Sequence, residues 1–261
     1  MTTKTEAKDG IIETLKTVFW ALLIAGVFRT IFFQPFWIPS SSMKDTLLVG
    51  DFLFVNKMAY GYSAYSCPFF KCPISGRILA SEPERGDIVV FSHPVNGQDF
   101  IKRLIGLPGD RVQVKDGVLY LNGVAAPQTP DGTFTETYER QGPLGNLPQC
   151  TGGRPADGAP CDKEKFVETL PGGVAHSVLN IRTSQLDNTP IYTVPEGQYF
   201  FMGDNRDNST DSRVPQAALG VGFVPFENLI GRADRVIYSS AGRSMLAFWT
   251  WRSDRYFKAL D

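Results

Sequence analysis

The sequence predicts a mostly β protein, with an N-terminal transmembrane helix followed by an antiparallel β-sheet domain that contains an inserted smaller β subdomain. Three observations predict this fold. An apolar segment of membrane-spanning length lies near the N-terminus, short alternating segments separated by turn residues follow it, and a Gly- and Pro-rich stretch interrupts them. A chain of 261 residues is long enough to bury the core of one large or two small domains.

The expected membrane anchor is residues 11–36, after a short cytoplasmic tail of residues 1–10. Residues 18–28 are apolar without interruption, and further apolar residues follow Arg29. A helix needs about 20 mostly apolar residues to cross a bilayer. A signal peptide that is later removed should end in small residues of the A-x-A type, whereas this segment ends in aromatic residues. We therefore expect an uncleaved anchor rather than a cleaved signal peptide or a buried core helix.

The cysteines indicate the orientation of this anchor better than the charges do. Basic residues on its two sides balance, so the positive-inside rule gives a tie. Cys67 and Cys72 have C-x4-C spacing, and Cys150 and Cys161 have C-x10-C spacing. Two local disulfides are the natural pairing, although four cysteines allow three connectivities, and a zinc site or free thiols are alternatives. Disulfides form in oxidising compartments, so this pairing would place the C-terminal part outside the cytoplasm.

Antiparallel β structure is expected after the anchor. Period-2 alternation or a short apolar run marks five strands: residues 87–91, 111–115, 118–121, 198–202 and 230–238. Asp116-Gly117 is a strong signal for a type I′ hairpin, and Asn122-Gly123 marks the next turn.

The domain boundaries follow from the apolar density, which falls between residues 127 and 195. We expect this stretch to be the inserted subdomain, dividing the main β domain into residues 37–126 and 196–261. The aromatic and basic C-terminal stretch at residues 248–258 fits either a membrane interface or a tail packed on the core. The net charge of −1 and the lack of a basic run argue against a nucleic-acid partner.

A hydroxyl-rich turn, Pro39-Ser40-Ser41-Ser42-Met43, begins just after the anchor. A serine nucleophile needs a base, and the whole chain holds only His93 and His176, both in loop-like sequence. Lys102 is the better candidate because it stands alone among the apolar residues of 100–107. A Ser/Lys pair is therefore favoured over a Ser/His/Asp triad.

Lysine acts as a base only when its pKa falls. A reference pKa near 10.4 must drop to about 8, which requires roughly 3 kcal/mol of differential destabilisation of the charged form. Burial among apolar side chains produces such a drop. Arg103 alternates to the opposite face of the strand, where it would be solvated or paired. The structural alternatives are an edge-strand lysine at Lys102 and a helix N-cap at the serines.

A third polar cluster, residues 203–213, follows a predicted strand. A calcium loop does not fit, because Asp207-x-Ser209-x-Asp211 lacks the required Gly and position 12 would be Ala218. No metal site is therefore expected there. The alternatives are a solvated Asx-rich turn and a loop whose hydroxyl and carboxylate orient the base.

In their order along the chain, these segments resemble the bacterial type I signal peptidase family, membrane-bound serine proteases that remove signal peptides. The resemblance covers most of the chain outside residues 127–195. It is carried by the anchor and by these motifs: Pro39-Ser40-Ser41-Ser42-Met43 with Thr46-Leu47, Arg85-Gly86-Asp87-Ile88-Val89-Val90-Phe91, Ile101-Lys102-Arg103 with Gly106-Leu107-Pro108-Gly109-Asp110, Gly203-Asp204-Asn205-Arg206-Asp207-Asn208-Ser209, and Asp211-Ser212-Arg213.

The resemblance implies a role for each matching residue. Ser42 is the nucleophile and Lys102 the general base, while Ser40 contributes to the oxyanion hole. Ser209 orients the lysine, with Asp211 and Arg213 supporting its loop. The implied substrate-binding residues are Phe36, Ile38, Pro39, Met43, Leu47, Phe100 and Ile101. The chain departs from the family at Asp45, where Pro is usual, and at Ser41, where Gly is frequent.

The activity implied by the resemblance is endoproteolytic removal of N-terminal signal peptides after an Ala-x-Ala-like site, without a cofactor. Its partners are preproteins and the lipid bilayer, and the protein functions as a monomer. It would be a single-pass protein of the bacterial inner membrane with its catalytic domain on the periplasmic side. Two alternatives are a Ser/Lys self-cleaving regulator and a non-catalytic anchored β module that binds extracytoplasmic partners.

Overall fold

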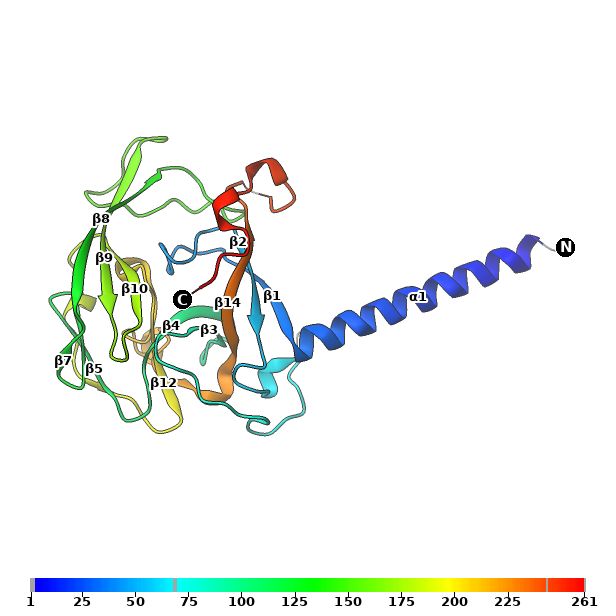
Figure 1. Cartoon of the computed structure of the whole chain (residues 1–261), viewed down its shortest axis with the longest axis horizontal. Coiled ribbons are helices and arrows are strands. Elements are labelled where there is room, and N and C mark those ends of the chain that lie inside the picture. Colours follow the sequence, from blue (N-terminus) through cyan, green and yellow to red (C-terminus); the bar gives the residue numbers. More distant parts are fainter. Residues whose placement is uncertain (1–2, 68–69, 243, 261) are drawn as a thin grey trace.

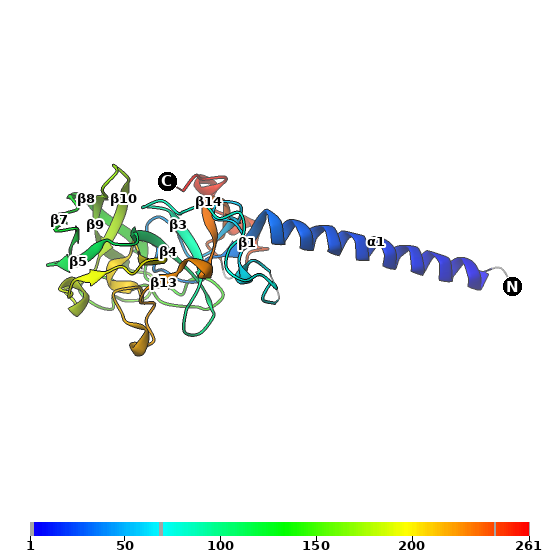
Figure 2. The same ribbon diagram turned by 90° about the horizontal axis from the view of Figure 1, so that it is seen from below.

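The computed structural model describes residues 3–67, 70–242 and 244–260, with only the backbone for residues 3–9. Helix α1 (Thr3–Ile31) projects from the β body as a single rod (Figures 1 and 2). Its part Gly10–Ile31 is long and apolar enough to cross a membrane, and none of it is buried against the rest of the chain. An apolar N-terminal helix is therefore confirmed.

The helix differs from the expected anchor at both ends. It includes residues 3–10 of the expected tail, and the first two residues lie outside the described part. It ends at Ile31, and the predicted last residues of the anchor instead belong to strand β1 (Phe33–Trp37). The physical reason is Pro35, which is disfavoured inside a helix, together with the partner strand that β1 finds in β2.

The body is built from short antiparallel strands. The remaining strands are β2 (Asp51–Asn56), β3 (Ile88–Ser92), β4 (Asp99–Gly106), β5 (Arg111–Lys115), β6 (Val118–Leu121), β7 (Val124–Ala125), β8 (Gln128–Thr137), β9 (Pro160–Thr169), β10 (Ala175–Asn180), β11 (Tyr192–Thr193), β12 (Gln198–Met202), β13 (Val224–Pro225) and β14 (Leu229–Ser239). Single 3-10 turns are η1 (Ala64–Ser66), η2 (Gln185–Asp187), η3 (Arg206–Asn208), η4 (Gln216–Ala218), η5 (Phe226–Asn228), η6 (Phe248–Thr250) and η7 (Ser253–Arg255).

These strands form three sheets, which confirms the mostly β fold. A seven-stranded sheet has the order β1-β2-β14-β3-β4-β12-β13, a four-stranded sheet the order β11-β5-β6-β7, and a three-stranded sheet the order β10-β9-β8. The five predicted strands are present, within a residue at each end. Both predicted turns have positive φ at each central residue, with 47° and 79° at Asp116 and Gly117 and 54° and 84° at Asn122 and Gly123, as type I′ turns require.

The expected insertion, residues 127–195, contributes strands to two sheets. Strands β8, β9 and β10 form a sheet of their own, at the end of the body far from α1 (Figures 1 and 2). Strand β11, however, pairs with β5, outside the expected insertion. The cause is a shared core, in which Val194 packs with Val112 and Phe200 from the flanking parts of the chain.

The large sheet has a hydrophobic layer on each face. All residues of β3 are buried, because Val90 packs into one layer while Val89 and Phe91 pack into the other. The first layer also contains Met43 and Leu47, which follow the serine-rich turn. The serine-rich turn is therefore anchored in this hydrophobic layer by the residues that follow it.

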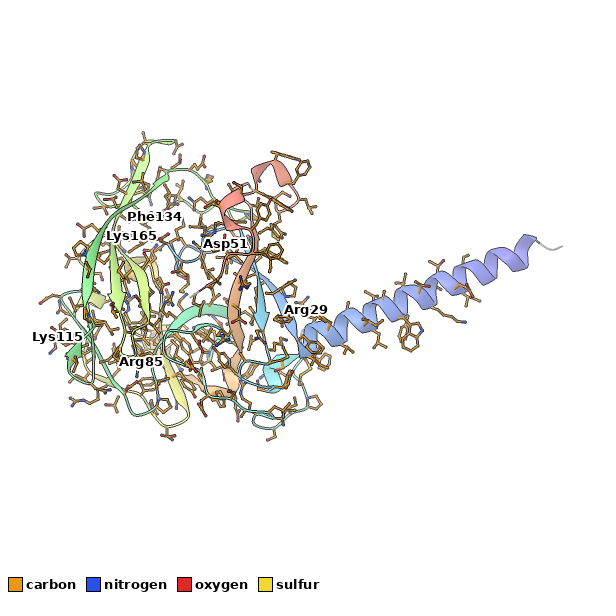
Figure 3. All side chains as sticks on the ribbon, viewed as in Figure 1. Arg29, Asp51, Arg85, Lys115, Phe134 and Lys165 are labelled. Atoms are coloured by element: carbon orange, nitrogen blue, oxygen red, sulfur yellow. A yellow bond between two sulfur atoms is a disulfide. The ribbon has the colours of Figure 1, made fainter. Side chains whose placement is uncertain are left out.

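The C-terminal stretch packs on the body at two points. Trp251 stacks on Tyr238 with ring centroids 4.4 Å apart, and Arg255 Nε donates to Asp51 Oδ1 at 2.9 Å. Phe248 and Trp249 remain exposed. In Figure 3, Asp51 lies within the body while Arg29 marks its junction with α1.

Candidate active site

The serine-rich turn and strand β4 bring Ser42 and Lys102 into contact. Lys102 Nζ lies 2.7 Å from Ser42 Oγ, and both residues are buried, with 4% and 7% of their surface exposed. Lys102 Nζ also donates to the Ile101 carbonyl oxygen at 3.0 Å. The structure thus joins the two residues that the sequence selected, although 60 residues separate them.

Burial changes the protonation of Lys102. It lowers the pKa of this lysine to about 8, although the carboxylates of Asp211 and Asp204 favour the charged form. At pH 7.4 about one fifth of such lysines would be neutral, against about 0.1% of unperturbed ones. An appreciable fraction of the molecules therefore has a neutral Lys102 amine in contact with the Ser42 hydroxyl, ready to accept its proton.

Two asparagines bind the serine turn, one through the backbone of the turn and one through a side chain of the turn. Asn205 N–H donates to the Ser42 carbonyl oxygen at 3.0 Å, and Asn205 Nδ2 donates to the Ser41 carbonyl oxygen at 3.0 Å. Asn208 Nδ2 donates to Ser41 Oγ at 2.5 Å. These contacts fix Ser42 against residues 203–213, and they use the hydroxyl that Ser41 adds relative to the Gly frequent in the resembling family.

Two buried ion pairs give this polar segment its shape. Arg103 makes a two-point contact with Asp204, with Nε–Oδ1 2.9 Å and Nη2–Oδ2 2.8 Å. Arg213 binds Asp211 in the same way, through Nε–Oδ1 and Nη2–Oδ2 contacts of 2.9 Å. Burial alone would raise the pKa of both carboxyls, but the two arginines hold the pKa of Asp204 and of Asp211 below the usual range. Arg103 is paired as expected and fully buried rather than solvated.

The expected bond from Ser209 to Lys102 is not formed. Ser209 Oγ is buried and makes no hydrogen bond of ordinary geometry among the described residues, although it lies near enough to Asp211 to help lower the pKa of that carboxyl. It packs so closely on Gly203 that a Cβ added there would lie 2.3 Å from the hydroxyl. The sequence placed Ser209 in the right loop, but it could not give the rotamer, which depends on this close packing.

A cavity of about 260 Å³ adjoins the Ser42–Lys102 pair. Of the predicted binding residues, Phe36, Ile38, Pro39, Phe100 and Ile101 line it, while Trp37, Ser40, Val90, Gln98, Asp99 and Lys102 complete the lining. Met43 and Leu47 do not line it, because both are buried in the core layer behind it. Ser40 Oγ lies 3.5 Å from Ser42 Oγ, on the exposed side of the turn.

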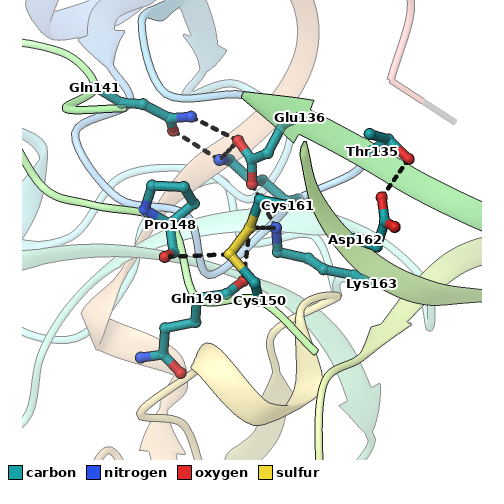
Figure 4. The surroundings of a disulfide bond; sticks show 10 residues. Thr135, Glu136, Gln141, Pro148, Gln149, Cys150, Cys161, Asp162 and Lys163 are labelled. Carbon is teal, nitrogen blue, oxygen red and sulfur yellow. Dashed lines mark hydrogen bonds and ion pairs between the residues drawn. A yellow bond between two sulfur atoms is a disulfide. The ribbon is translucent and has the colours of Figure 1, made fainter. Parts of the chain in front are cut away.

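All four cysteines form the two expected disulfides, Cys67–Cys72 and Cys150–Cys161. This pairing removes both the zinc-ligand and the free-thiol alternatives for these residues. Figure 4 shows the second disulfide beside Lys163, which lies on β9, and Glu136, which lies on β8.

A buried charge cluster connects that disulfide region to the serine turn. Glu136 Oε2 accepts from Lys44 Nζ at 2.5 Å, and Glu136 Oε1 accepts from Lys163 Nζ at 2.5 Å. Gln141 contacts both Lys44 and Glu136. Lys44 is two residues from Ser42, so the β8–β9 hairpin is tied directly to the nucleophile segment. Sequence reasoning missed this cluster, since nothing local pairs Glu136 with a lysine 92 positions away.

Neither histidine contacts Ser42 in the part of the chain that the structure describes. His93 Nδ1 accepts from the Val95 and Asn96 backbone N–H groups, and the ring packs on Phe100. His176 lies in strand β10 rather than in a loop, with Nε2 3.4 Å from Glu168 Oε1.

The chain is similar in sequence to known signal peptidases. A model of the family described as signal peptidase, peptidase S26, matches residues 11–238. The chain is 39% identical to a signal peptidase I of Rickettsia canadensis (strain McKiel) over 248 residues, covering 91% of this chain and 84% of that protein. It is 42% identical to a signal peptidase I of Rickettsia prowazekii (strain Madrid E) over 231 residues, covering 85% and 78%. A crystal structure of a signal peptidase I from Enterococcus faecalis V583 aligns with 30% identity and a TM-score of 0.30, covering 58% of this chain and 97% of that one.

Proposed function

The chain belongs to the signal peptidase family, peptidase S26, and from this membership we propose that it removes signal peptides with Ser42 as nucleophile and Lys102 as general base. The observation that carries the proposal is the 2.7 Å contact between Lys102 Nζ and Ser42 Oγ in a buried setting. The substrates are preproteins cleaved after an Ala-x-Ala site, whose small side chains enter the cavity of about 260 Å³.

In the first step, neutral Lys102 accepts the Ser42 hydroxyl proton while Oγ bonds to the scissile carbonyl carbon. The resulting oxyanion is stabilised by the Ser42 backbone N–H and the Ser40 hydroxyl. The C–N bond then breaks as the Lys102 ammonium gives its proton to the leaving amine. Lys102 next deprotonates a water, which attacks the acyl-enzyme carbonyl carbon. The bond from Ser42 Oγ to the acyl carbon then breaks as the Lys102 ammonium returns the proton to Oγ, which releases the signal peptide and restores Ser42.

Anchoring by α1 would place this reaction at a membrane surface. We propose a single-pass arrangement in the bacterial inner membrane with the β body on the periplasmic side, where preproteins emerge. The two disulfides support this side, because they form in oxidising compartments. Enzyme and substrate would then share a two-dimensional surface, which raises their effective concentration.

The test is cleavage of a purified preprotein by the wild type, Ser42→Ala, Lys102→Ala and Lys102→Arg. We expect only the wild type to cleave, since guanidinium cannot release its proton at working pH. Covalent labelling of Ser42 by a serine-acylating lipopeptide would separate the enzyme from a non-catalytic binding module. Substantial cleavage by either Lys102 variant would overturn the proposed base.

A further inference from the structure

A second cavity, of about 550 Å³, lies beside the Cys150–Cys161 disulfide. Its walls come from the loop between β8 and β9 and from the residues that follow β10, including Gln149, Arg154 and Arg182. It shares no described lining residue with the cavity beside Ser40 and Lys102. The disulfide and the buried Tyr138 hold one wall of this cavity in place.

Side-chain hydrogen bonds lead from the nucleophile turn to this second cavity. Asn208 Nδ2 donates to Ser41 Oγ at 2.5 Å, and Gln149 Nε2 donates to Asn208 Oδ1 at 2.9 Å. The first cavity is formed by segments around β1 and β4, and the proposed function assigns it to the acyl side of the substrate. Ser41 and Asn208 do not line that cavity, so a path along them is open to the chain beyond the scissile bond.

The distance along this path is short. Two hydrogen bonds and one amide side chain span less than about 10 Å, and an extended peptide advances about 3.3 Å per residue. The residues about two to four positions after the cleavage site would therefore reach the second cavity.

The charges of the cavity indicate what it would bind. Arg154 and Arg182 are both exposed, and neither side chain makes a hydrogen bond or ion pair within residues 10–67, 70–242 and 244–260. The nearby carboxylate of Asp207 is engaged through Oδ2 by the backbone N–H groups of Ile181 and Arg182. Two free guanidinium groups at one rim are suited to bind carboxylates.

We propose that this cavity is the subsite for the first residues of the mature protein and that Arg154 and Arg182 favour acidic side chains there. This inference rests on the proposed function, since it takes Ser42 as the cleavage centre. It assigns the β8–β9 loop a part in substrate selection.

The experiment uses three preproteins that differ only at positions +2 to +4, which carry two Glu, two Gln or two Lys. We expect wild-type kcat/KM to fall in the order Glu, Gln, Lys. The Arg154→Gln/Arg182→Gln variant should lose about three- to tenfold on the Glu substrate and nothing on the Gln substrate, in keeping with exposed ion pairs. The reversed variant Arg154→Glu/Arg182→Glu should prefer the Lys substrate, and each preference should shrink at high salt.

Arg111→Gln, which removes an exposed arginine on β5, is the matched control and should keep the wild-type order. An unchanged Glu:Gln:Lys ratio in both double variants would overturn the subsite while leaving the proposed function intact. A loss of kcat/KM on the Gln substrate in the Arg154→Gln/Arg182→Gln variant would also overturn the subsite, because the arginines would then act through something other than the charge of the substrate. Failure of the wild type to cleave the Gln substrate would refute the function itself.

Discussion

At the scale of single residues, position rather than pKa distinguishes the proposed base. Lys57 is also fully buried, and burial lowers its pKa to about 8, as it does for Lys102. Its Nζ, however, donates to the Ser66 carbonyl oxygen, and within the described residues it makes no hydrogen bond to a serine hydroxyl. Only the lysine that faces Ser42 can take a proton from it.

The pH dependence follows from the lowered pKa of Lys102. Because the base works only when neutral, kcat/KM should rise with pH through about 8 and then level off. A rate profile from about pH 6 to 10 on a preprotein would measure it. A rise that begins only near pH 10 would mean that the base has an unperturbed amine. Lys57→Met should leave the midpoint of the profile unchanged.

The small cavity beside Ser42 predicts the side chains accepted at position −1 of the substrate. The proposed Ala-x-Ala specificity requires the walls at Ile38 and Ile101 to admit only a small side chain at this position, so Ala should be accepted and Leu or Phe should nearly abolish cleavage. Ser and Gly should remain tolerable, since one methyl group is worth only about 1 to 3 kcal/mol. A set of preproteins that vary only at −1 provides the measurement. Efficient cleavage after Phe would indicate a broad-specificity protease.

At the scale of elements, the β8–β9 hairpin is fastened to the catalytic segment through charge. Glu136 on β8 is shared by Lys44 from the serine turn and Lys163 from β9, with both lysines at most 2% exposed. Burial lowers the pKa of Lys44, and Glu136 opposes this effect. Without that carboxylate, two ammonium groups would face each other in the interior.

Glu136→Gln should therefore cost about 3 kcal/mol of unfolding free energy, the range for a buried pair that loses one partner. Asp131→Asn, which breaks the contact of this half-exposed carboxylate with Lys165 on the same hairpin, should cost less than about 1 kcal/mol. Urea unfolding of the three proteins in detergent gives the comparison. Equal free energies of unfolding for the Glu136→Gln and Asp131→Asn variants would show that Glu136 contributes no more to stability than an exposed charge does.

At the scale of the whole molecule, a second charge network couples the inserted sheet to the catalytic loop. His176 on β10 is buried against Glu168 and Asp204, with Arg103 and Arg206 nearby. Burial lowers the pKa of His176 to about 4, so the imidazole stays neutral in the folded protein at neutral pH. The unfolded chain binds this proton near its ordinary pKa of about 6.5.

Stability should fall as the pH drops from about 6.5 to about 4, because the unfolded state takes up the proton first. The loss due to His176 is about 3 kcal/mol, and His176→Gln should remove that share of the pH dependence. Carboxylates such as Glu168 contribute in the same direction, and because Glu168 is coupled to His176 the difference between the two proteins reports the histidine together with that coupling. Identical pH profiles for the two proteins would disprove this role.

The sequence predicted local features well and non-local ones poorly. Asp116-Gly117 specified its turn, and the apolar neighbours of Lys102 indicated burial, because both signals lie within a few residues. The pairing of β11 with β5 and the contact of Asn208 with Ser41 depend on segments about 80 and 167 positions apart. The burial of Met43 and Leu47 in the core layer depends likewise on distant segments, since only the packed core shows which apolar residues lie behind the cavity.

The junction of α1 with β1 joins the helix and the body tightly. Only Phe32 separates the two elements, and its carbonyl oxygen accepts from the Lys57 N–H at 3.0 Å while the Ile31 carbonyl oxygen accepts from the Tyr62 hydroxyl at 2.8 Å. A helix of 29 residues fixed in this way would transmit any change of its own tilt to the body. A helix tilts when its apolar segment is longer than the hydrocarbon core of the bilayer is thick, so a thinner bilayer would increase the tilt of α1. The thickness of the surrounding lipid would then set the angle at which Ser42 meets an emerging chain.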